Sequence, residues 1–98
     1  MKYALIGCGR ISPNHIVAAK SNCLEIVGLC DINSDTLYGR AKEFGLNHVS
    51  LYLDYCEMLK KEKPELVAIA TESGKHAEIA LNCIRAGCNL IIEKPIAL

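Results

Sequence analysis

The sequence lacks both an excess of charge and any long apolar run. Its 98 residues contain 11 Lys and Arg and 11 Asp and Glu, so its formal net charge is zero. A chain balanced in this way has no field that would draw nucleic acid or an anionic membrane. The longest apolar runs, Leu66–Ala70 and Leu90–Ile92, are far too short to cross a bilayer. We therefore expect neither nucleic acid nor a membrane as a partner.

Repeats, low-complexity tracts and recognisable linkers are also missing. Met1-Lys2 leads directly into an apolar segment and leaves no room for a signal peptide, which predicts a cytoplasmic location. The length fits one small domain. Because 51% of the residues are hydrophobic and 22% are charged, the composition is typical of a globular core rather than a disordered tail.

Six cysteines are many for this length, yet the spacings of zinc sites are absent. There is no Cys-x-x-Cys, and no His stands at zinc-finger spacing from a Cys pair, so we expect no metal. An even count allows disulfides, but the expected compartment favours free thiols, and most of these cysteines lie in apolar runs. Cys8 instead lies in a glycine turn. A helix N-terminus there would lower its thiol pKa; alternatively, Cys8 is simply small enough to fit beside a ligand.

What the sequence does contain is a regular alternation of apolar runs and helix-forming segments. The runs predict five strands: Tyr3–Ile6, Leu24–Cys30, His48–Leu51, Leu66–Ala70 and Asn89–Ile92. The segments between them predict four helices: Asn14–Lys20, a helix capped by Asn33 or Ser34 that runs to about Phe44, a helix capped by Asp54 that runs to about Lys61, and Lys75–Ala86. This alternation predicts an α/β fold with a doubly wound, Rossmann-type parallel sheet of order 3-2-1-4-5.

A full fold of this type has a sixth strand, and the chain ends before one can form. The strand predicted at Asn89–Ile92 would then be an open edge with unpaired backbone groups. Either something else covers this edge or residues 1–98 are one dinucleotide-binding domain of a longer protein. We favour the second interpretation, a fold truncated before its sixth strand and before a second domain.

The glycine turn Gly7-Cys8-Gly9 joins the first predicted strand to the first helix. Outward-facing N–H groups and the helix dipole make such a corner an anion site, usually for a dinucleotide pyrophosphate. Ser12 stands where the fingerprint has Gly or Ala, which predicts slightly looser helix packing. Alone the turn is weak evidence, because many glycine turns bind nothing. The residues of this segment that we expect to contact a cofactor are Gly7, Cys8, Gly9, Arg10, Ile11 and Ser12.

Asp31 strengthens this interpretation. It ends the second predicted strand, close to the spacing of about 20 residues after the glycines that dinucleotide sites show. A carboxylate there accepts hydrogen bonds from both ribose hydroxyls of adenosine and repels a 2′-phosphate, which favours NAD over NADP. Ile32 lies beside it in the same loop. Arg10 could still approach a phosphate, and Arg40 is on the next helix; the plainer alternative is that Asp31 is an ordinary turn residue.

A second group of polar residues follows the fourth and fifth predicted strands. Carboxyl ends of parallel strands share the ligand-facing edge of the sheet, so Thr71 and Ser73 could line a cofactor groove. His76 could face the ligand or make only a local bond at a helix start. Beside a nicotinamide cation the pKa of Lys94 would fall, and Lys94 could exchange a proton with a substrate hydroxyl. Alternatively, Glu93 and Lys94 are an exposed pair that ends a strand.

Several motifs occur together in the order typical of one family: Gly7-x-Gly9, His15, Asp31, Pro64–Thr71, His76, Ala86-Gly87 and Glu93-Lys94-Pro95. In this combination the chain resembles the N-terminal domain of Gfo/Idh/MocA oxidoreductases. The resemblance implies hydride transfer between nicotinamide and a hydroxyl of a sugar, an inositol or a nucleotide-sugar. It also implies cofactor contacts at Glu93 and Lys94, with Lys94 near the reacting hydroxyl. Ser73-Gly74 departs from the Pro-Asn often found in the family.

The resemblance further implies a second domain, absent from this sequence, that holds most of the substrate site and often mediates homo-oligomers. The 98-residue chain alone should then bind cofactor but not turn over. The opening residues 4–15 also resemble family members that oxidise nucleotide-linked N-acetylhexosamines at the sugar 3-position. Two alternatives remain: a free-standing, non-catalytic dinucleotide-binding module or remnant, and a methyltransferase with a similar adenosine site, which would leave Glu93-Lys94-Pro95 unexplained.

Overall fold

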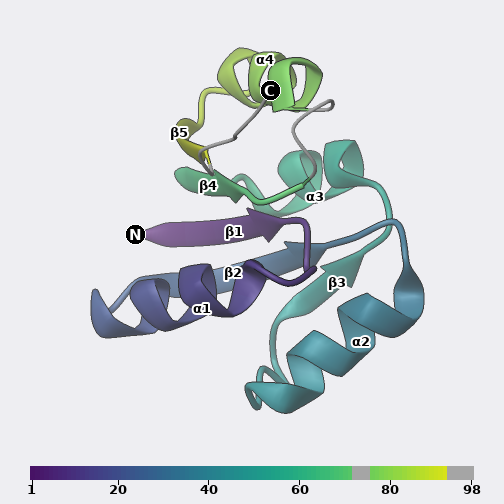
Figure 1. Cartoon of the computed structure of the whole chain (residues 1–98). Helices are drawn as coiled ribbons and strands as arrows, with labels where there is room; N and C mark the ends of the chain where they lie inside the picture. Colours follow the sequence, from purple (N-terminus) through teal and green to yellow (C-terminus); the bar gives the residue numbers. More distant parts are fainter. Residues whose placement is uncertain (72–75, 93–98) are drawn as a thin grey trace.

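The computed structural model describes residues 1–71 and 76–92 and confirms the predicted alternation of strands and helices (Figure 1). Its five strands pair in parallel in the predicted order, β3-β2-β1-β4-β5. The strands are β1 (Lys2–Ile6), β2 (Glu25–Cys30), β3 (Ser50–Tyr52), β4 (Leu66–Ile69) and β5 (Asn89–Ile92). The helices are α1 (Ser12–Ser21), α2 (Ser34–Glu43), α3 (Tyr55–Glu62) and α4 (His76–Arg85).

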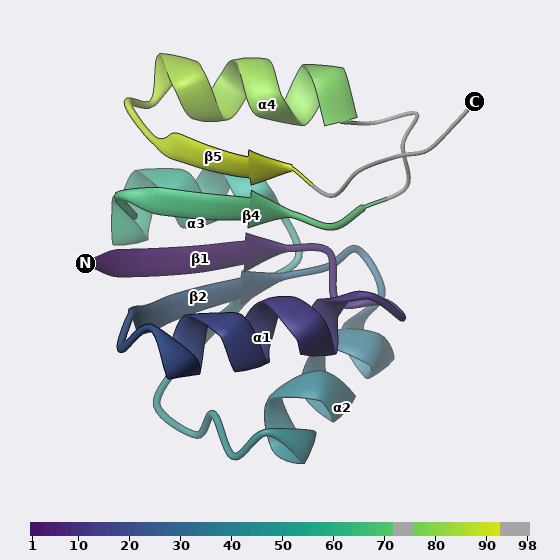
Figure 2. The same cartoon turned by 60° about the vertical axis from the view of Figure 1, so that its left-hand side comes forward.

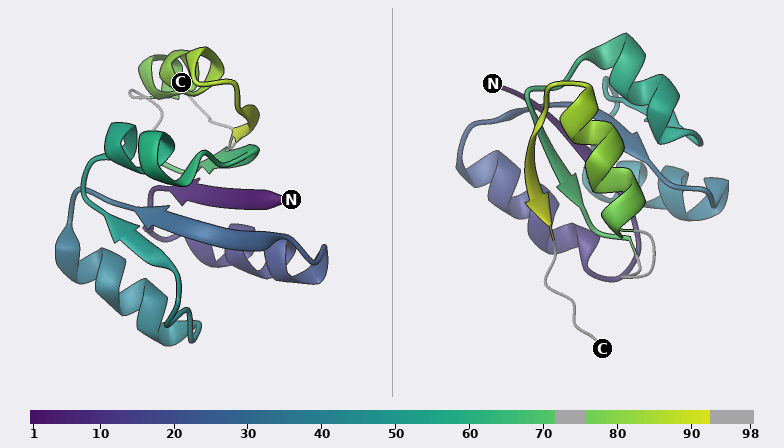
Figure 3. Two further views of the ribbon diagram at one scale, coloured as in Figure 1. Left: turned by 180° about the vertical axis from the view of Figure 1, so that it is seen from behind. Right: turned by 90° about the horizontal axis from the view of Figure 1, so that it is seen from above.

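Helices cover both faces of the sheet, as a doubly wound fold requires. The alternation of side chains along β1 divides the core, since Tyr3 and Leu5 face α1 and α2 while Ala4 and Ile6 face α3 and α4. Figure 1 shows these two helix pairs on opposite sides of the sheet, and Figure 3 shows them from behind and from above. Because both faces are covered, the central strands are continuous apolar runs.

Local signals set most element boundaries. The side chain of Asn33 accepts a hydrogen bond from Thr36 N–H at the start of α2, and Asp54 accepts one from Cys56 N–H at the start of α3. The third strand lies slightly later than predicted, because Val49 N–H bonds to Leu46 O in a turn and Tyr52 pairs with Cys30. The other boundaries agree with the predictions within two residues or so.

All six cysteines are free. Cys8, Cys30, Cys83 and Cys88 are buried, whereas Cys23 and Cys56 are exposed. Burial, helped by the negative charge of Asp31, raises the pKa of the Cys8 thiol to about 12. The idea that the helix N-terminus activates Cys8 is therefore wrong: its side chain is fully enclosed in the core.

β5 forms one edge of the sheet, beside β4 (Figure 2), and β3 forms the other edge. Within residues 1–71 and 76–92, no strand pairs with the outer side of β5. Ile91 and Ile92 are 43% and 44% exposed there. Among the described helices, none combines the length and the apolar character needed to cross a bilayer.

Candidate functional site

The glycine turn lies where the carboxyl ends of β1, β2 and β4 meet. Gly7 donates its N–H to Cys30 O at 2.8 Å and has φ of +101°. A Cβ atom on Gly7 would lie 2.8 Å from the backbone of Ala70 and Thr71, so only glycine fits here. A Cβ on Gly9 would meet no atom within 4 Å, so the turn presents open space on that side.

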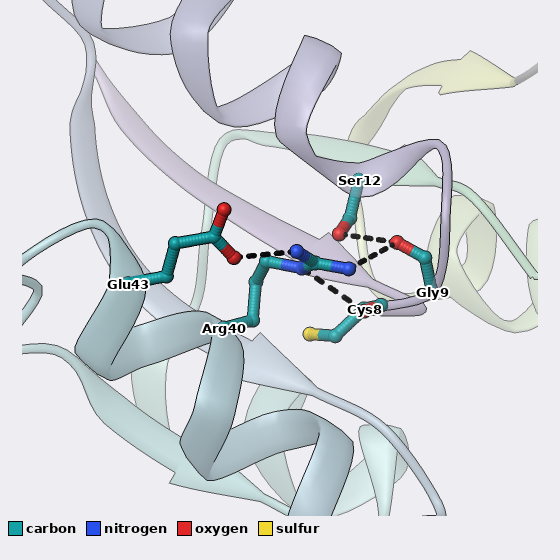
Figure 4. Close-up of polar contacts among 5 residues, drawn as sticks. All are labelled: Cys8, Gly9, Ser12, Arg40 and Glu43. Atoms are coloured by element: carbon teal, nitrogen blue, oxygen red, sulfur yellow. Dashed lines mark hydrogen bonds and ion pairs between the residues drawn. The ribbon is translucent and has the colours of Figure 1, made fainter.

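Arg40 of α2 holds the carbonyl groups of this turn (Figure 4). Its Nε donates to Cys8 O at 3.2 Å and its Nη2 donates to Gly9 O at 2.9 Å. Its Nη1 lies 2.6 Å from Glu43 Oε1, one helical turn further along α2. Sequence reasoning considered Arg40 only as a distant candidate for a 2′-phosphate and missed this role.

Ser12 also contributes to the turn. Its hydroxyl donates to Gly9 O at 2.8 Å, and its side chain is fully buried. The slightly looser helix packing expected from Ser12 in place of glycine stays a prediction. The Ser12 hydroxyl is used within the protein, while Arg10 and Ile11 are exposed beside it.

The orientation of the carbonyl groups determines where the amides point. In a trans peptide, C=O and the following N–H point in opposite directions. Because Cys8 O and Gly9 O face Arg40, the N–H groups of Gly9 and Arg10 face away from α2. No acceptor for these two N–H groups is present among the described residues. Adjacent free amides before a helix N-terminus form an anion-binding concavity.

Asp31 lies against the same turn, at the carboxyl end of β2. Its Oδ2 accepts Cys8 N–H at 2.7 Å and its Oδ1 accepts Asn33 N–H at 2.8 Å. An ionised carboxylate has about four acceptor positions, so about two remain for a ligand. The protein thus orients this carboxylate before any ligand arrives.

A cavity of about 650 Å³ opens at this edge of the sheet. This volume is in the range typical of small-molecule sites. Of the predicted site residues, Gly7, Gly9, Asp31, Ile32 and Thr71 line it. Sequence reasoning missed other lining residues, chiefly Leu53, Tyr55, Glu78 and Ile79. Leu53 and Tyr55 follow the carboxyl end of β3, so the rule that found Thr71 could have found them too.

The predicted residues that follow β4 and β5 divide into two groups. Thr71 lies at the carboxyl end of β4, and its side-chain oxygen is buried without a hydrogen-bond partner in the part of the chain that is described. His76 Nε2 lies 2.5 Å from Thr71 O, which is the local bond that the plainer interpretation of His76 expects. Ser73, Glu93 and Lys94 lie outside the described residues. Within the described ranges, no group of three or more His, Cys, Asp or Glu residues could hold a metal ion.

Comparison with known proteins gives a consistent result. D-apiose dehydrogenase of Paraburkholderia graminis is 40% identical to this chain, over 99% of the chain and 26% of the relative. D-glucoside 3-dehydrogenase of Escherichia coli is 30% identical, over 100% of the chain and 28% of the relative. The chain thus spans about a quarter of the length of these relatives.

Solved structures agree with this comparison. The WlbA dehydrogenase of Bordetella pertussis, solved in complex with NADH and UDP-GlcNAcA, superposes with a TM-score of 0.88 at 33% identity, over 98% of this chain and 29% of the other. Residues 1–98 match the family described as "Oxidoreductase family, NAD-binding Rossmann fold" (GFO_IDH_MocA). The chain therefore belongs to the Gfo/Idh/MocA oxidoreductase family and represents its NAD-binding Rossmann fold.

Proposed function

We propose that the chain binds NAD across the carboxyl edge of its sheet. The pyrophosphate lies on the amides of Gly9 and Arg10, and the adenosine ribose lies against Asp31. The observation that carries this proposal is that Asp31 and the turn glycines line one cavity of about 650 Å³. The NADH complex of the Bordetella pertussis relative supports the same assignment.

Two features favour NAD over NADP. The carboxylate of Asp31 would repel a 2′-phosphate on the ribose that it binds. Arg40, the candidate cation on α2, is already bonded to the carbonyls of Cys8 and Gly9 and paired with Glu43. To bind a 2′-phosphate it would have to give up these partners.

The whole protein would be a dehydrogenase acting on a hydroxyl of a sugar, an inositol or a nucleotide-sugar. The names of the relatives support this range, because they include an apiose dehydrogenase and a dehydrogenase bound to UDP-GlcNAcA. The bound nicotinamide would accept or supply the hydride. Lys94 would exchange the proton of the substrate hydroxyl, with Ser73, His76 and Glu93 on the nicotinamide side.

In this proposal residues 1–98 are the cofactor domain of a longer, cytoplasmic protein, which could form homo-oligomers. A second domain would supply most of the substrate site. The coverage of about a quarter of each relative supports this division. The 98-residue chain alone is then expected to bind NADH but to show no sugar-dependent reduction of NAD.

Calorimetry with NADH tests the binding proposal. We expect saturable binding of NADH and weaker binding of NADPH, because only NADPH brings a phosphate next to Asp31. S-adenosylmethionine is the matched control, since it carries adenosine and its ribose but no pyrophosphate. Tight binding of S-adenosylmethionine with no binding of NADH would reject the dehydrogenase assignment.

Substitution of Lys94 tests the catalytic proposal. Lys94→Ala should barely change the NADH affinity of the chain and should abolish turnover when present in the longer protein. Lys60→Ala, at an exposed position on α3, is the control and should leave both unchanged. Full turnover by the Lys94 variant would exclude its role in proton transfer.

A further inference from the structure

Arg40 makes a contact to the glycine turn that no motif in the sequence predicts. It lies 31 positions after Gly9 in the sequence, yet its guanidinium reaches two consecutive carbonyls of the turn. A planar guanidinium donates in a fixed fork, so it can hold both carbonyls in one geometry. Figure 4 shows the side chain extending from α2 toward these two carbonyls.

The surroundings of Arg40 keep it in this place. Its side chain is 19% exposed, and Glu43 orients the guanidinium from the next turn of the same helix. In this partly buried position, bonds from a charged donor are stronger than ordinary amide bonds. The Ser12 hydroxyl and Arg40 both donate to Gly9 O, so this carbonyl has two side-chain donors.

The Cys8 residue is held from both ends. Asp31 accepts its N–H, and Arg40 donates to its C=O. The two charged side chains come from β2 and α2, and together they prevent the peptide planes on either side of Cys8 from rotating. The N–H groups of Gly9 and Arg10 are thereby directed away from α2, without an acceptor among the described residues.

We propose that Arg40 is a positioning residue for pyrophosphate binding. It does not touch the cofactor; it acts through the carbonyls of Cys8 and Gly9 and keeps the following amides aimed at the phosphates. This inference rests on the proposed binding of NAD. If Arg40 has this role, the affinity for the pyrophosphate depends on this side chain of α2.

Titration of Arg40 variants with fragments of the cofactor tests this role. Arg40→Met removes the fork but keeps most of the apolar stem, and Arg40→Lys keeps the charge without the fork. Arg85→Met, at an exposed position on α4 far from the turn, is the control. The ligands are NADH and ADP-ribose, which contain a pyrophosphate, and adenosine, which does not; circular dichroism confirms that each variant is folded at the temperature used.

For Arg40→Met we expect NADH and ADP-ribose to bind about tenfold more weakly or worse. The reason is that the N–H groups of Gly9 and Arg10 would no longer be held in the orientation that binds the phosphates. Adenosine affinity, followed by NMR shifts, should stay within a factor of about two, because Asp31 still holds the ribose. Arg40→Lys should recover only part of the loss, and Arg85→Met should bind as the unmodified chain does. In ¹⁵N relaxation the Gly9 and Arg10 amides should become more mobile in Arg40→Met.

Other outcomes would overturn the proposal. Equal losses for adenosine and ADP-ribose would show that Arg40 only stabilises the fold. Unchanged affinity for all three ligands would show that the turn does not need it. If the unmodified chain binds adenosine but neither NADH nor ADP-ribose, the proposed NAD site itself fails, which is a distinct result.

Discussion

Replacement of Asp31 by alanine should weaken NADH binding and lower stability for separate reasons. The carboxylate would lose its bonds to the ribose hydroxyls, which we expect to cost about 1–3 kcal/mol of binding free energy. At 25 °C this is roughly a fivefold to 150-fold loss of affinity. In addition, Cys8 N–H would lose the acceptor that now lies 2.7 Å away.

The second loss affects folding. Cys8 is fully buried, so its orphaned N–H should lower the free energy of unfolding by about 1–3 kcal/mol. Asn33 N–H also loses its acceptor, but Asn33 is exposed and water can replace the carboxylate. Asp31→Asn separates the two effects, because its amide oxygen can still accept Cys8 N–H while its negative charge is gone.

The assay combines calorimetry with NADH and NADPH and unfolding in urea, for each variant at the same pH and salt concentration. Asp31→Asn should raise the affinity for NADPH relative to NADH, since the repulsion of a 2′-phosphate is lost. Asp35→Ala removes an exposed carboxylate from the first turn of α2 and is the control. Unchanged NADH affinity in a folded Asp31→Ala variant would refute the ribose role.

Three further predictions concern the turn and the thiols. Gly7→Ala should lower the free energy of unfolding in urea by about 1–3 kcal/mol, because the new Cβ would meet the backbone that follows β4 and the φ of Gly7 is unfavourable for alanine. Gly39→Ala inside α2 should instead raise it by about 0.5–1 kcal/mol. Equal effects of the two substitutions would contradict this reasoning. Brief treatment with iodoacetamide at pH 8 should modify only Cys23 and Cys56 in the folded chain, and mass spectrometry of the native and denatured forms checks this. Because burial raises their thiol pKa values to about 12, Cys8, Cys30 and Cys83 stay protonated when folded but ionise when unfolded near pH 9. The contribution of these thiols to the free energy of unfolding is then fully present below about pH 8. It should fall by at most about 1.4 kcal/mol per pH unit per thiol as the pH rises toward 12. A urea midpoint that is unchanged between pH 8 and pH 10.5 would argue against this prediction.

Most of the fold follows from patterns that are local in the sequence. The strand predicted at Asn89–Ile92 is β5 as observed, and the caps at Asn33 and Asp54 mark two helix starts. These signals act within a few residues, through propensity, capping and apolar periodicity. β3 was placed less well because it is a short edge strand, and its pairing with β2 decided its position more than its own pattern did.

Part of the site could also be predicted, because its geometry follows from topology. Gly7, Gly9, Asp31 and Thr71 were found because the carboxyl ends of adjacent parallel strands meet at one edge. The structure places all four around one cavity. The chemical role of Lys94 stays a prediction, since it lies outside the described residues.

The sequence by itself determined the strand–turn–helix corner and the acidic end of β2, because each depends on neighbours along the chain. The order of the sheet places β1 beside β4, which is distant in sequence, and it followed from the topology rule for alternating strands and helices. Only the tertiary structure decided how the corner is held. Arg40 lies a whole strand and helix beyond Gly9, and no spacing rule connects them. α2 must pack beside α1 and β2 before its guanidinium can reach the two carbonyls, and this contact orients the amides of the turn.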